Sequence, residues 1–278
     1  MIALGQYNTL RIVKRVDFGL YLDGGEAGEI LMPERYVTDA MLPGTEVEVF
    51  LYLDQEERLV ATTERPVATV GQFAWLPVAW TNRYGAFLGW GLMKDLFCPF
   101  REQKQTMQRD RSYIVYIKED EESHRLMATA KVERYLQPAP HTLHHGDEVQ
   151  ILVWQKTDLG FKVIVDNRYQ GQLYDDQLFQ PVTSGQRFTA YIDHVRQDGK
   201  IDLTLQPTGQ RHALDFAEQL LRYIYEHDGY CPFTDSSSAD DIVAEFQVSK
   251  KVFKRAVGDL YRRHLIVIDA DGLRLTHM

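Results

Sequence analysis

Two hydrophobic periods divide the chain. As far as about residue 209, short apolar runs alternate with polar positions and are separated by turn residues. This pattern is typical of small antiparallel β-barrels. From Gln210 onward the apolar residues follow a period of 3.6, which is typical of amphipathic helices. The sequence therefore predicts a mainly β protein with an α+β domain at its C-terminal end.

The β-rich part repeats one pattern three times. Gly19, Gly85 and Gly160 each open a short strand, and each is followed downstream by a similar closing hairpin. The last strand of that hairpin follows a basic residue and ends in threonine in all three copies. A period of this length suits a duplicated domain rather than a solenoid. We predict three five-stranded barrels at residues 1–66, 67–136 and 142–208, with a proline-rich linker at 137–141.

Residues 209–278 predict a winged-helix domain. An apolar stripe marks the first helix, and Ser238 and Ser249 are suitable N-caps for two more. Asp271 and Gly272 then form the turn of a β-hairpin. The third helix carries a basic face made of Lys250, Lys251, Lys254, Arg255 and Arg262. In winged helices that read DNA, such a face enters the major groove, whereas a solvated or domain-packing face is the alternative.

Charge is distributed unevenly among the predicted domains. The chain of 278 residues has a net charge of −9, which argues against nonspecific coating of nucleic acid. Counting Lys and Arg against Asp and Glu, the region 67–140 alone is positive, so an anion-binding site is expected there. No apolar run reaches 18 residues. We therefore expect a cytoplasmic protein without membrane contact, with Cys98 and Cys231 as free thiols.

The barrel motifs resemble the S-one RNA-binding domain, the OB-fold named after the first protein of the small ribosomal subunit. That domain has an aromatic-Gly-x-aromatic pair, a third ring on the next strand and a basic residue before the closing strand. The second copy matches with Tyr84, Phe87, Phe97 and Arg125. The first copy has Phe18, Tyr21 and Arg58, with Leu31 in the third ring's place. In the third copy Leu159 and Lys162 replace two rings, while Tyr174 and Lys200 are taken as the third ring and the base.

Three such barrels followed by a winged helix resemble the conserved virulence factor B family of bacterial cytoplasmic RNA-binding proteins. The resemblance covers essentially the whole chain and implies RNA binding with an effect on gene expression.

Aromatic rings beside basic residues suit single-stranded RNA, because rings stack on unpaired bases while Arg and Lys hold the phosphates. The main candidate site is Tyr84, Phe87, Phe97 and Arg125, with Lys131 or Arg83 adding charge. Further candidates are Phe18, Tyr21 and Arg58 in the first barrel and Lys162, Tyr174 and Lys200 in the third. The competing interpretation places these rings in the barrel cores.

The sequence favours no catalytic chemistry. His141, His144 and His145 have no other ligand at metal-binding spacing, and the acidic run 119–122 is too compact for a two-metal site. We expect no enzyme activity, metal or cofactor, and a monomer that binds single-stranded RNA and acts in post-transcriptional control. Two alternatives remain open. One is a DNA-binding regulator that uses the third helix, and the other is an adaptor that binds a ribosome or polymerase component.

Overall fold

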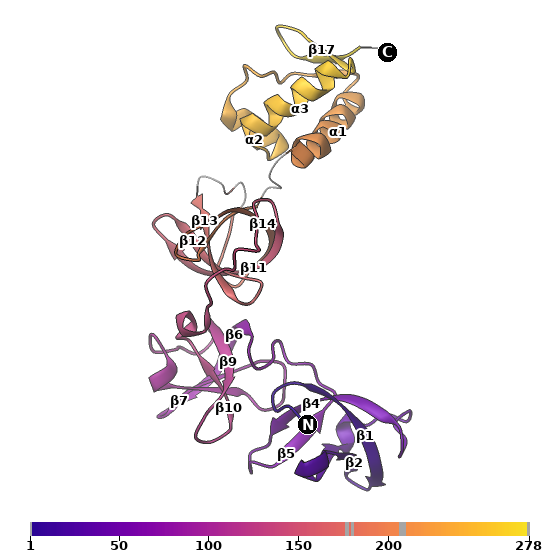
Figure 1. Cartoon of the computed structure of the whole chain (residues 1–278), viewed down its shortest axis with the longest axis vertical. Coiled ribbons are helices and arrows are strands. Elements are labelled where there is room, and N and C mark those ends of the chain that lie inside the picture. The colour runs from indigo at the N-terminus through magenta and orange to yellow at the C-terminus, as the bar shows by residue number, and fades with distance from the viewer. Residues whose placement is uncertain (1, 176–177, 179–180, 206–209, 277–278) are drawn as a thin grey trace. The chain divides into compact units, whose positions relative to one another are not determined.

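The computed structural model describes residues 2–175, 178, 181–205 and 210–276 (Figure 1). The chain forms two compact units, residues 1–136 and 137–278. The first unit contains two β-barrels, and the second contains a third barrel and the helical domain. None of the described helices is long and apolar enough to span a membrane.

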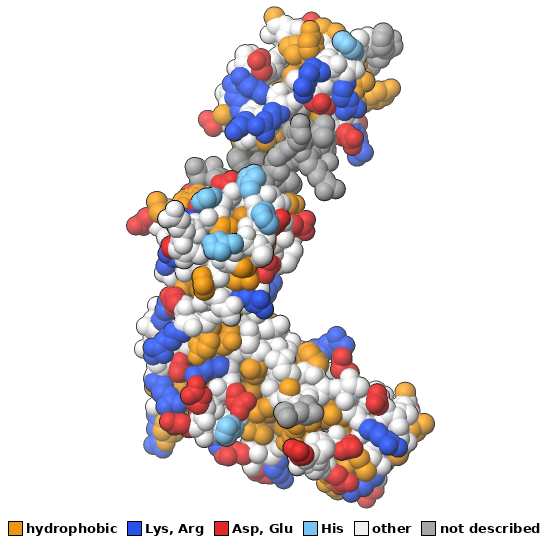
Figure 2. Space-filling model, viewed as in Figure 1, with side chains coloured by type: hydrophobic (Ala, Val, Ile, Leu, Met, Phe, Trp, Pro, Cys, Tyr) orange, Lys and Arg blue, Asp and Glu red, His pale blue; other side chains and the backbone are white. Residues whose placement is uncertain are grey.

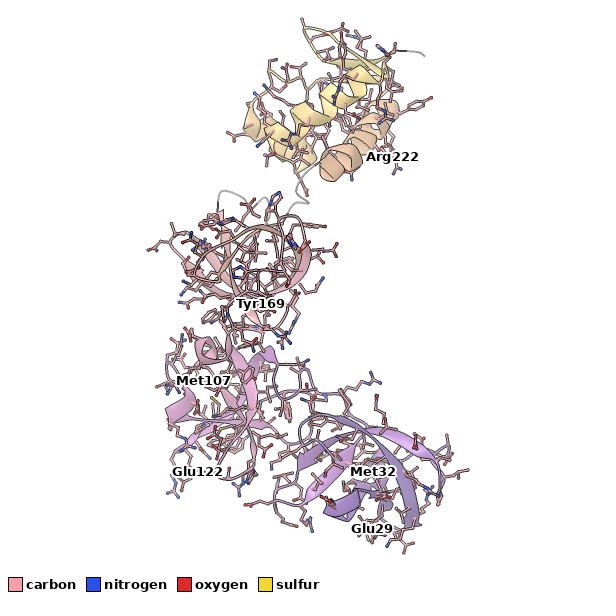
Figure 3. The ribbon with its side chains drawn as sticks, in the orientation of Figure 1. Glu29, Met32, Met107, Glu122, Tyr169 and Arg222 are labelled. Atoms are coloured by element: carbon pink, nitrogen blue, oxygen red, sulfur yellow. The ribbon has the colours of Figure 1, made fainter. Side chains whose placement is uncertain are left out.

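The first barrel has five strands, closed in the order β1-β2-β3-β5-β4. They are β1 (Tyr7–Val16), β2 (Gly19–Asp23), β3 (Glu29–Pro33), β4 (Glu46–Leu53) and β5 (Leu59–Thr62). The strands pair antiparallel except β3 with β5, which run parallel. Alternate residues of each strand point inward and fill the barrel. Met32, labelled in Figure 3, is one of these fully buried side chains.

The second barrel repeats this topology, closed in the equivalent order β6-β7-β8-β10-β9. Its strands are β6 (Phe73–Asn82), β7 (Gly85–Leu88), β8 (Leu96–Pro99), β9 (Ser112–Glu119) and β10 (Leu126–Thr129). Its core includes Ala74, Leu76, Leu88 and Met107, the last labelled in Figure 3.

The two barrels of the first unit share part of one core. Phe50, on β4, is fully buried and packs edge-on against Trp90 of the second barrel, with ring centroids 5.7 Å apart. The Lys94 ammonium donates hydrogen bonds of 2.8 Å to the backbone oxygens of Leu53 and Asp54. Barrels of this size bury limited cores, so a shared apolar contact stabilises both.

The third barrel closes in the same order again, β11-β12-β13-β15-β14. Its strands are β11 (Glu148–Thr157), β12 (Gly160–Val165), β13 (Tyr169–Tyr174), β14 (Arg187–Val195) and β15 (Ile201–Thr204). The segment predicted as a linker is tied to this barrel. Gln137 N–H donates to the Arg168 oxygen at 2.9 Å, and Ala139 N–H donates to the Gly199 oxygen at 2.8 Å.

The helical domain consists of α1 (Gln210–Glu226), α2 (Ala239–Phe246), α3 (Lys250–Arg262) and a three-stranded sheet. The sheet contains β16 (Tyr230–Cys231), β17 (Ile266–Ile268) and β18 (Leu273–Leu275). The Ser238 hydroxyl accepts from Asp241 N–H, and the Ser249 hydroxyl accepts from Val252 N–H, so both predicted N-caps are present. The predicted fold class, three barrels and a winged helix, is confirmed. The short strand β16 was not expected.

Candidate nucleic-acid interface

The three barrels offer the same outward-facing positions on their first three strands. Each position is counted from the repeated glycine. The first lies five residues before the glycine on the first strand, the second lies two residues after it on the second strand, and the third lies twelve residues after it on the third strand. Hydrogen-bonded register places the three side by side across neighbouring strands. They are Lys14, Tyr21 and Leu31 in the first barrel, Trp80, Phe87 and Phe97 in the second, and Gln155, Lys162 and Gln172 in the third.

Only in the second barrel are all three positions aromatic. The rings of Trp80 and Phe87 stack face to face, with centroids 3.7 Å apart and an interplanar angle of 3°. Phe97 packs against Phe87 at 4.9 Å with a tilt of 37°. We call Trp80, Phe87 and Phe97 the ring ladder. The rings lie on the outer surface of the barrel rather than in its core, and Phe87 and Phe97 lie between inward-facing neighbours.

Trp80 was absent from the residues that the sequence predicted. Ala74, Leu76 and Val78 point inward, so strict alternation would place Trp80 inside as well. A β-bulge between Val78 and Trp80 shifts the register and turns the indole outward. The signal lay in the other copies, because Lys14 and Gln155 occupy the same position and are polar.

A carboxylate fixes the indole of Trp80. The Nε1–H group of Trp80 donates a 2.9 Å hydrogen bond to Asp95 Oδ2. Asp95 lies just before β8, and among the described residues no Lys or Arg lies within ion-pairing distance of it. Trp80 is nevertheless 43% exposed. The ladder therefore ends in a flat, oriented and solvent-accessible ring.

Tyr84 provides a separate exposed ring at the turn between β6 and β7. The Asn82 side-chain oxygen accepts hydrogen bonds from the backbone N–H groups of Tyr84 and Gly85, which fixes the turn. Tyr84 is 58% exposed, and the Arg83 guanidinium lies 4.8 Å from its ring centroid. Within the described part of the chain, no carboxylate forms an ion pair with Arg83, so its charge is available to a phosphate.

The glycine beside this turn is required by close packing of two strands. A Cβ built on Gly85 would lie 2.4 Å from the Cys98 oxygen and 2.9 Å from Cε2 of Phe97. Equivalent contacts exist at Gly19 and Gly160, where a Cβ would lie 2.1 Å and 2.0 Å from backbone oxygens. The repeated glycine therefore allows the second and third strands of each barrel to approach.

The basic residues predicted at the barrel closures are all engaged with protein groups. Arg58 pairs with Asp54 and Glu56, Arg125 pairs with Glu57 of the first barrel, and Lys200 pairs with Asp198 at 2.6 Å. The hydrogen bond from Lys200 lowers the pKa of the Asp198 carboxyl. Lys131 donates to the Arg101 backbone oxygen. A phosphate would have to compete for each of these cations.

The first barrel keeps two rings of the predicted site. Phe18 is 57% exposed and meets Tyr21 edge to face at 6.3 Å. The Lys14 ammonium lies 4.9 Å from the Tyr21 centroid and pairs with Glu29 at 2.6 Å. Because Leu31 fills the third position, this barrel presents a shorter aromatic surface with an acidic group beside it.

The third barrel differs from the prediction. The sequence motif predicts Tyr174 as the third ring, but this residue lies opposite Gly160, which is the position of Pro33 and Pro99 in the other barrels. Register places Gln172 beside Lys162 instead. The Tyr174 hydroxyl is hydrogen-bonded with Asp202 and Arg196, and burial followed by the Asp202 charge raises its pKa. The assignment of Tyr174 as an equivalent of Phe97 is therefore wrong.

The basic face of α3 is divided. Lys250 donates to the Ser237 oxygen at 2.6 Å, Lys254 lies 4.0 Å from Asp235, and Arg262 contacts Asp259. Lys251 and Arg255 are exposed one turn apart, and the described residues place no carboxylate within ion-pairing distance of them. Figure 2 shows Lys and Arg side chains gathered over α2 and α3.

No group of three His, Cys, Asp or Glu side chains suited to a metal ion occurs in the described residues. His145 instead contacts the backbone oxygen of Asp193 through Nδ1 at 2.7 Å, and His144 lies 3.8 Å from Asp147.

Comparison with known proteins finds two matching domain models and bacterial relatives that align over most of the chain. The S1 domain model matches residues 4–64, and the CvfB-like winged helix domain model matches residues 218–275. The uncharacterized protein YitL of Bacillus subtilis (strain 168) is 30% identical, covering 93% of this chain and 89% of its own. Conserved virulence factor B of Staphylococcus aureus (strain N315) is 24% identical, covering 91% and 86%.

Among solved structures, a multidomain protein with nucleic acid binding domains from Streptococcus pneumoniae TIGR4 covers 98% of both chains, at 22% identity and a TM-score of 0.43. The match to YitL over most of both chains and the winged-helix match agree with the resemblance that the sequence motifs indicate. The chain belongs to the conserved virulence factor B family.

Proposed function

We propose that this protein binds single-stranded RNA without catalysing a reaction and acts in post-transcriptional control of gene expression in the cytoplasm. The ring ladder carries the proposal. Flat aromatic surfaces stack on unpaired bases of any identity, and each stacked base contributes about 1–3 kcal/mol. Arg83, beside the exposed Tyr84 ring, supplies a cation for the backbone of the same strand.

Two further observations support this proposal. The second barrel carries the positive domain charge, with more Lys and Arg than Asp and Glu. An S1 domain model matches the first barrel. We expect the third barrel and the winged helix to add backbone contacts through Lys162, Lys251 and Arg255, which would lengthen the bound strand.

The test is a titration of a labelled uridine-rich single-stranded RNA at two salt concentrations. The variant Phe87→Ala with Phe97→Ala removes two rings of the ladder. Its matched control, Lys162→Ala with Gln172→Ala, changes the same register positions of the third barrel. We expect the first variant to weaken binding at least tenfold and the control to weaken it less. Equal losses in both variants, or none in either, would refute the proposed site.

The exposed pair Lys251 and Arg255 supports a second candidate function, contact with duplex DNA through α3. Lys251→Glu with Arg255→Glu would then abolish binding to duplex DNA, whereas single-stranded RNA binding would lose only the contribution of the winged helix and would persist through the ring ladder. A wild-type chain that binds neither nucleic acid, but forms a stable complex with a ribosome or polymerase component, would favour the adaptor alternative.

A further inference from the structure

Building on the proposed RNA binding, we infer that the base-stacking surface of the second barrel is the outer face of Trp80, with Asp95 as the residue that positions it. In this arrangement Phe87 supports the indole and does not itself contact the base through the face that the indole covers.

The ring geometry is the first reason. A separation of 3.7 Å and an angle of 3° are what a base stacked on Phe87 would show. The indole therefore already occupies that face of Phe87, and Phe97 packs against the same ring from the neighbouring strand. A base could take the covered face only by displacing the indole and breaking its hydrogen bond to Asp95.

Accessibility is the second reason. Trp80 is 43% exposed, whereas Phe87 and Phe97 are half-buried. On the side of β6 away from β7, β9 pairs with Phe73–Pro77, and the backbone of Val78 then bonds with Arg111 and Asp110. Trp80 lies beyond this covered stretch, so the described strands leave the end of β6 that carries the indole open.

The first barrel shows that this arrangement comes from the fold. Lys14 has the position of Trp80, and its ammonium lies over the ring of Tyr21, which has the position of Phe87. The residue at the first-strand position thus covers the residue at the second-strand position in both barrels. In the second barrel the covering group is aromatic, so the cover can itself stack on a base.

Asp95 is otherwise hard to explain on an RNA-binding surface, because an unpaired carboxylate repels phosphate. Its hydrogen bond to the indole gives it a positioning role. An indole that Asp95 already holds in place loses less side-chain freedom when RNA binds, which lowers the entropic cost of association. The carboxylate therefore favours binding through Trp80 even though its charge opposes it.

The charge of Asp95 and its hydrogen bond to the indole have opposite effects on RNA affinity, so removing the carboxylate distinguishes between them. We would titrate the full chain with a short labelled oligouridylate and follow both anisotropy and tryptophan emission. Asp95→Ala removes a negative charge, so a purely electrostatic role predicts tighter binding, whereas the positioning role predicts weaker binding. Asp95→Asn keeps a side-chain oxygen that can accept from the indole, and it should retain binding.

Substitution of Trp80 completes the experiment. Trp80→Ala should weaken binding roughly tenfold or more, Trp80→Phe should recover part of the loss, and RNA-induced quenching of tryptophan emission should disappear in Trp80→Phe. Gln155→Ala, the equivalent position of the third barrel, is the matched control. If Phe87 is the stacking ring, Trp80→Ala uncovers it and binding is kept or strengthened, which would overturn the inference while leaving RNA binding by the barrel intact. A wild-type chain that binds no RNA would overturn both proposals.

Discussion

The substitution Gly85→Ala should damage both the stability of the second barrel and the RNA site proposed on it. The added Cβ would lie 2.4 Å from the Cys98 oxygen, 2.8 Å from Pro99 Cα and 2.9 Å from Phe97 Cε2. Two of these are backbone atoms of β8, which cannot rotate away. To restore ordinary contact at 3.4 Å, β7 and β8 would have to separate by about 1 Å, which strains their hydrogen bonds.

Overpacking of this kind costs about 1–3 kcal/mol of unfolding free energy. The assay is guanidinium unfolding of the full chain followed by tryptophan emission. Trp75, Trp80 and Trp90 lie in or against the second barrel, out of 4 tryptophans in the chain, so the emission mainly reports that barrel. We also expect weaker RNA binding, since Phe97 must move with β8.

Gly89→Ala is the matched control, because it adds the same methyl group in the same barrel. The Cβ there would meet Pro77 Cγ at 3.7 Å, an ordinary contact. This variant should change the unfolding free energy by less than about 0.5 kcal/mol. If Gly85→Ala were as stable as Gly89→Ala and bound RNA normally, the explanation of the repeated glycine would fail.

Three further outcomes are expected. Phe50→Ala, although it lies in the first barrel, should destabilise the tryptophan-reported unfolding of the second by about 3–5 kcal/mol, because Phe50 packs on Trp90; independent barrels would give no shift. Burial, followed by the Glu102 charge, raises the pKa of the Cys98 thiol to about 12, and burial raises that of Cys231. Both thiols therefore stay protonated at pH 8 and should react with a disulfide reagent only after unfolding, whereas fast reaction of the native chain would contradict this. RNA affinity should fall with salt, with a slope reduced by about 0.7 in Arg83→Ala, whereas Arg125→Ala, already paired with Glu57, should change the slope less.

The sequence was sufficient for the repeat and for the fold. Periodicity, turn residues and the glycines at 19, 85 and 160 locate the strands that the barrels contain. Such signals are local, because strand alternation and N-caps depend on neighbouring residues. For Phe87 and Phe97 the sequence leaves a core position open as the competing interpretation, whereas in the structure they alternate with the buried residues Ala86, Leu88 and Cys98 and lie on the outer surface.

The sequence misses Trp80 and misplaces Tyr174 for the same reason, which is that the register between strands is not visible in a single motif. A one-residue bulge reverses the direction of every side chain beyond it, so Trp80 faces outward although alternation places it inward. Residue type alone favours Tyr174 as the third ring, whereas the interval that joins Gly19 to Leu31 and Gly85 to Phe97 leads to Gln172. Aligning the three copies at fixed intervals would have corrected both.

Ion pairing could not be predicted from the motif. The basic residue before each closing strand is present in all three copies, but its carboxylate partner comes from a hairpin or, for Arg125, from the first barrel. A motif gives the residue type and not its neighbour. Arg83 differs from these basic residues. Its guanidinium lies over the ring of Tyr84, and no carboxylate among the described residues pairs with it, so its charge is available to RNA.

The same backbone thus supports three chemically different surfaces, and residue type at three register positions decides between them. Lys162 with two glutamines in the third barrel can hold a phosphate but offers no ladder of rings. Lys14, Tyr21 and Leu31 in the first barrel offer one ring, covered by a cation that Glu29 partly neutralises. The ring ladder is continuous, fixed by Asp95 and carried by a barrel whose core extends into its neighbour through Phe50. A rigid surface loses little freedom on binding, so we expect the first barrel to raise the affinity of the proposed RNA site by stabilising the second barrel, even where it makes no contact with the strand itself.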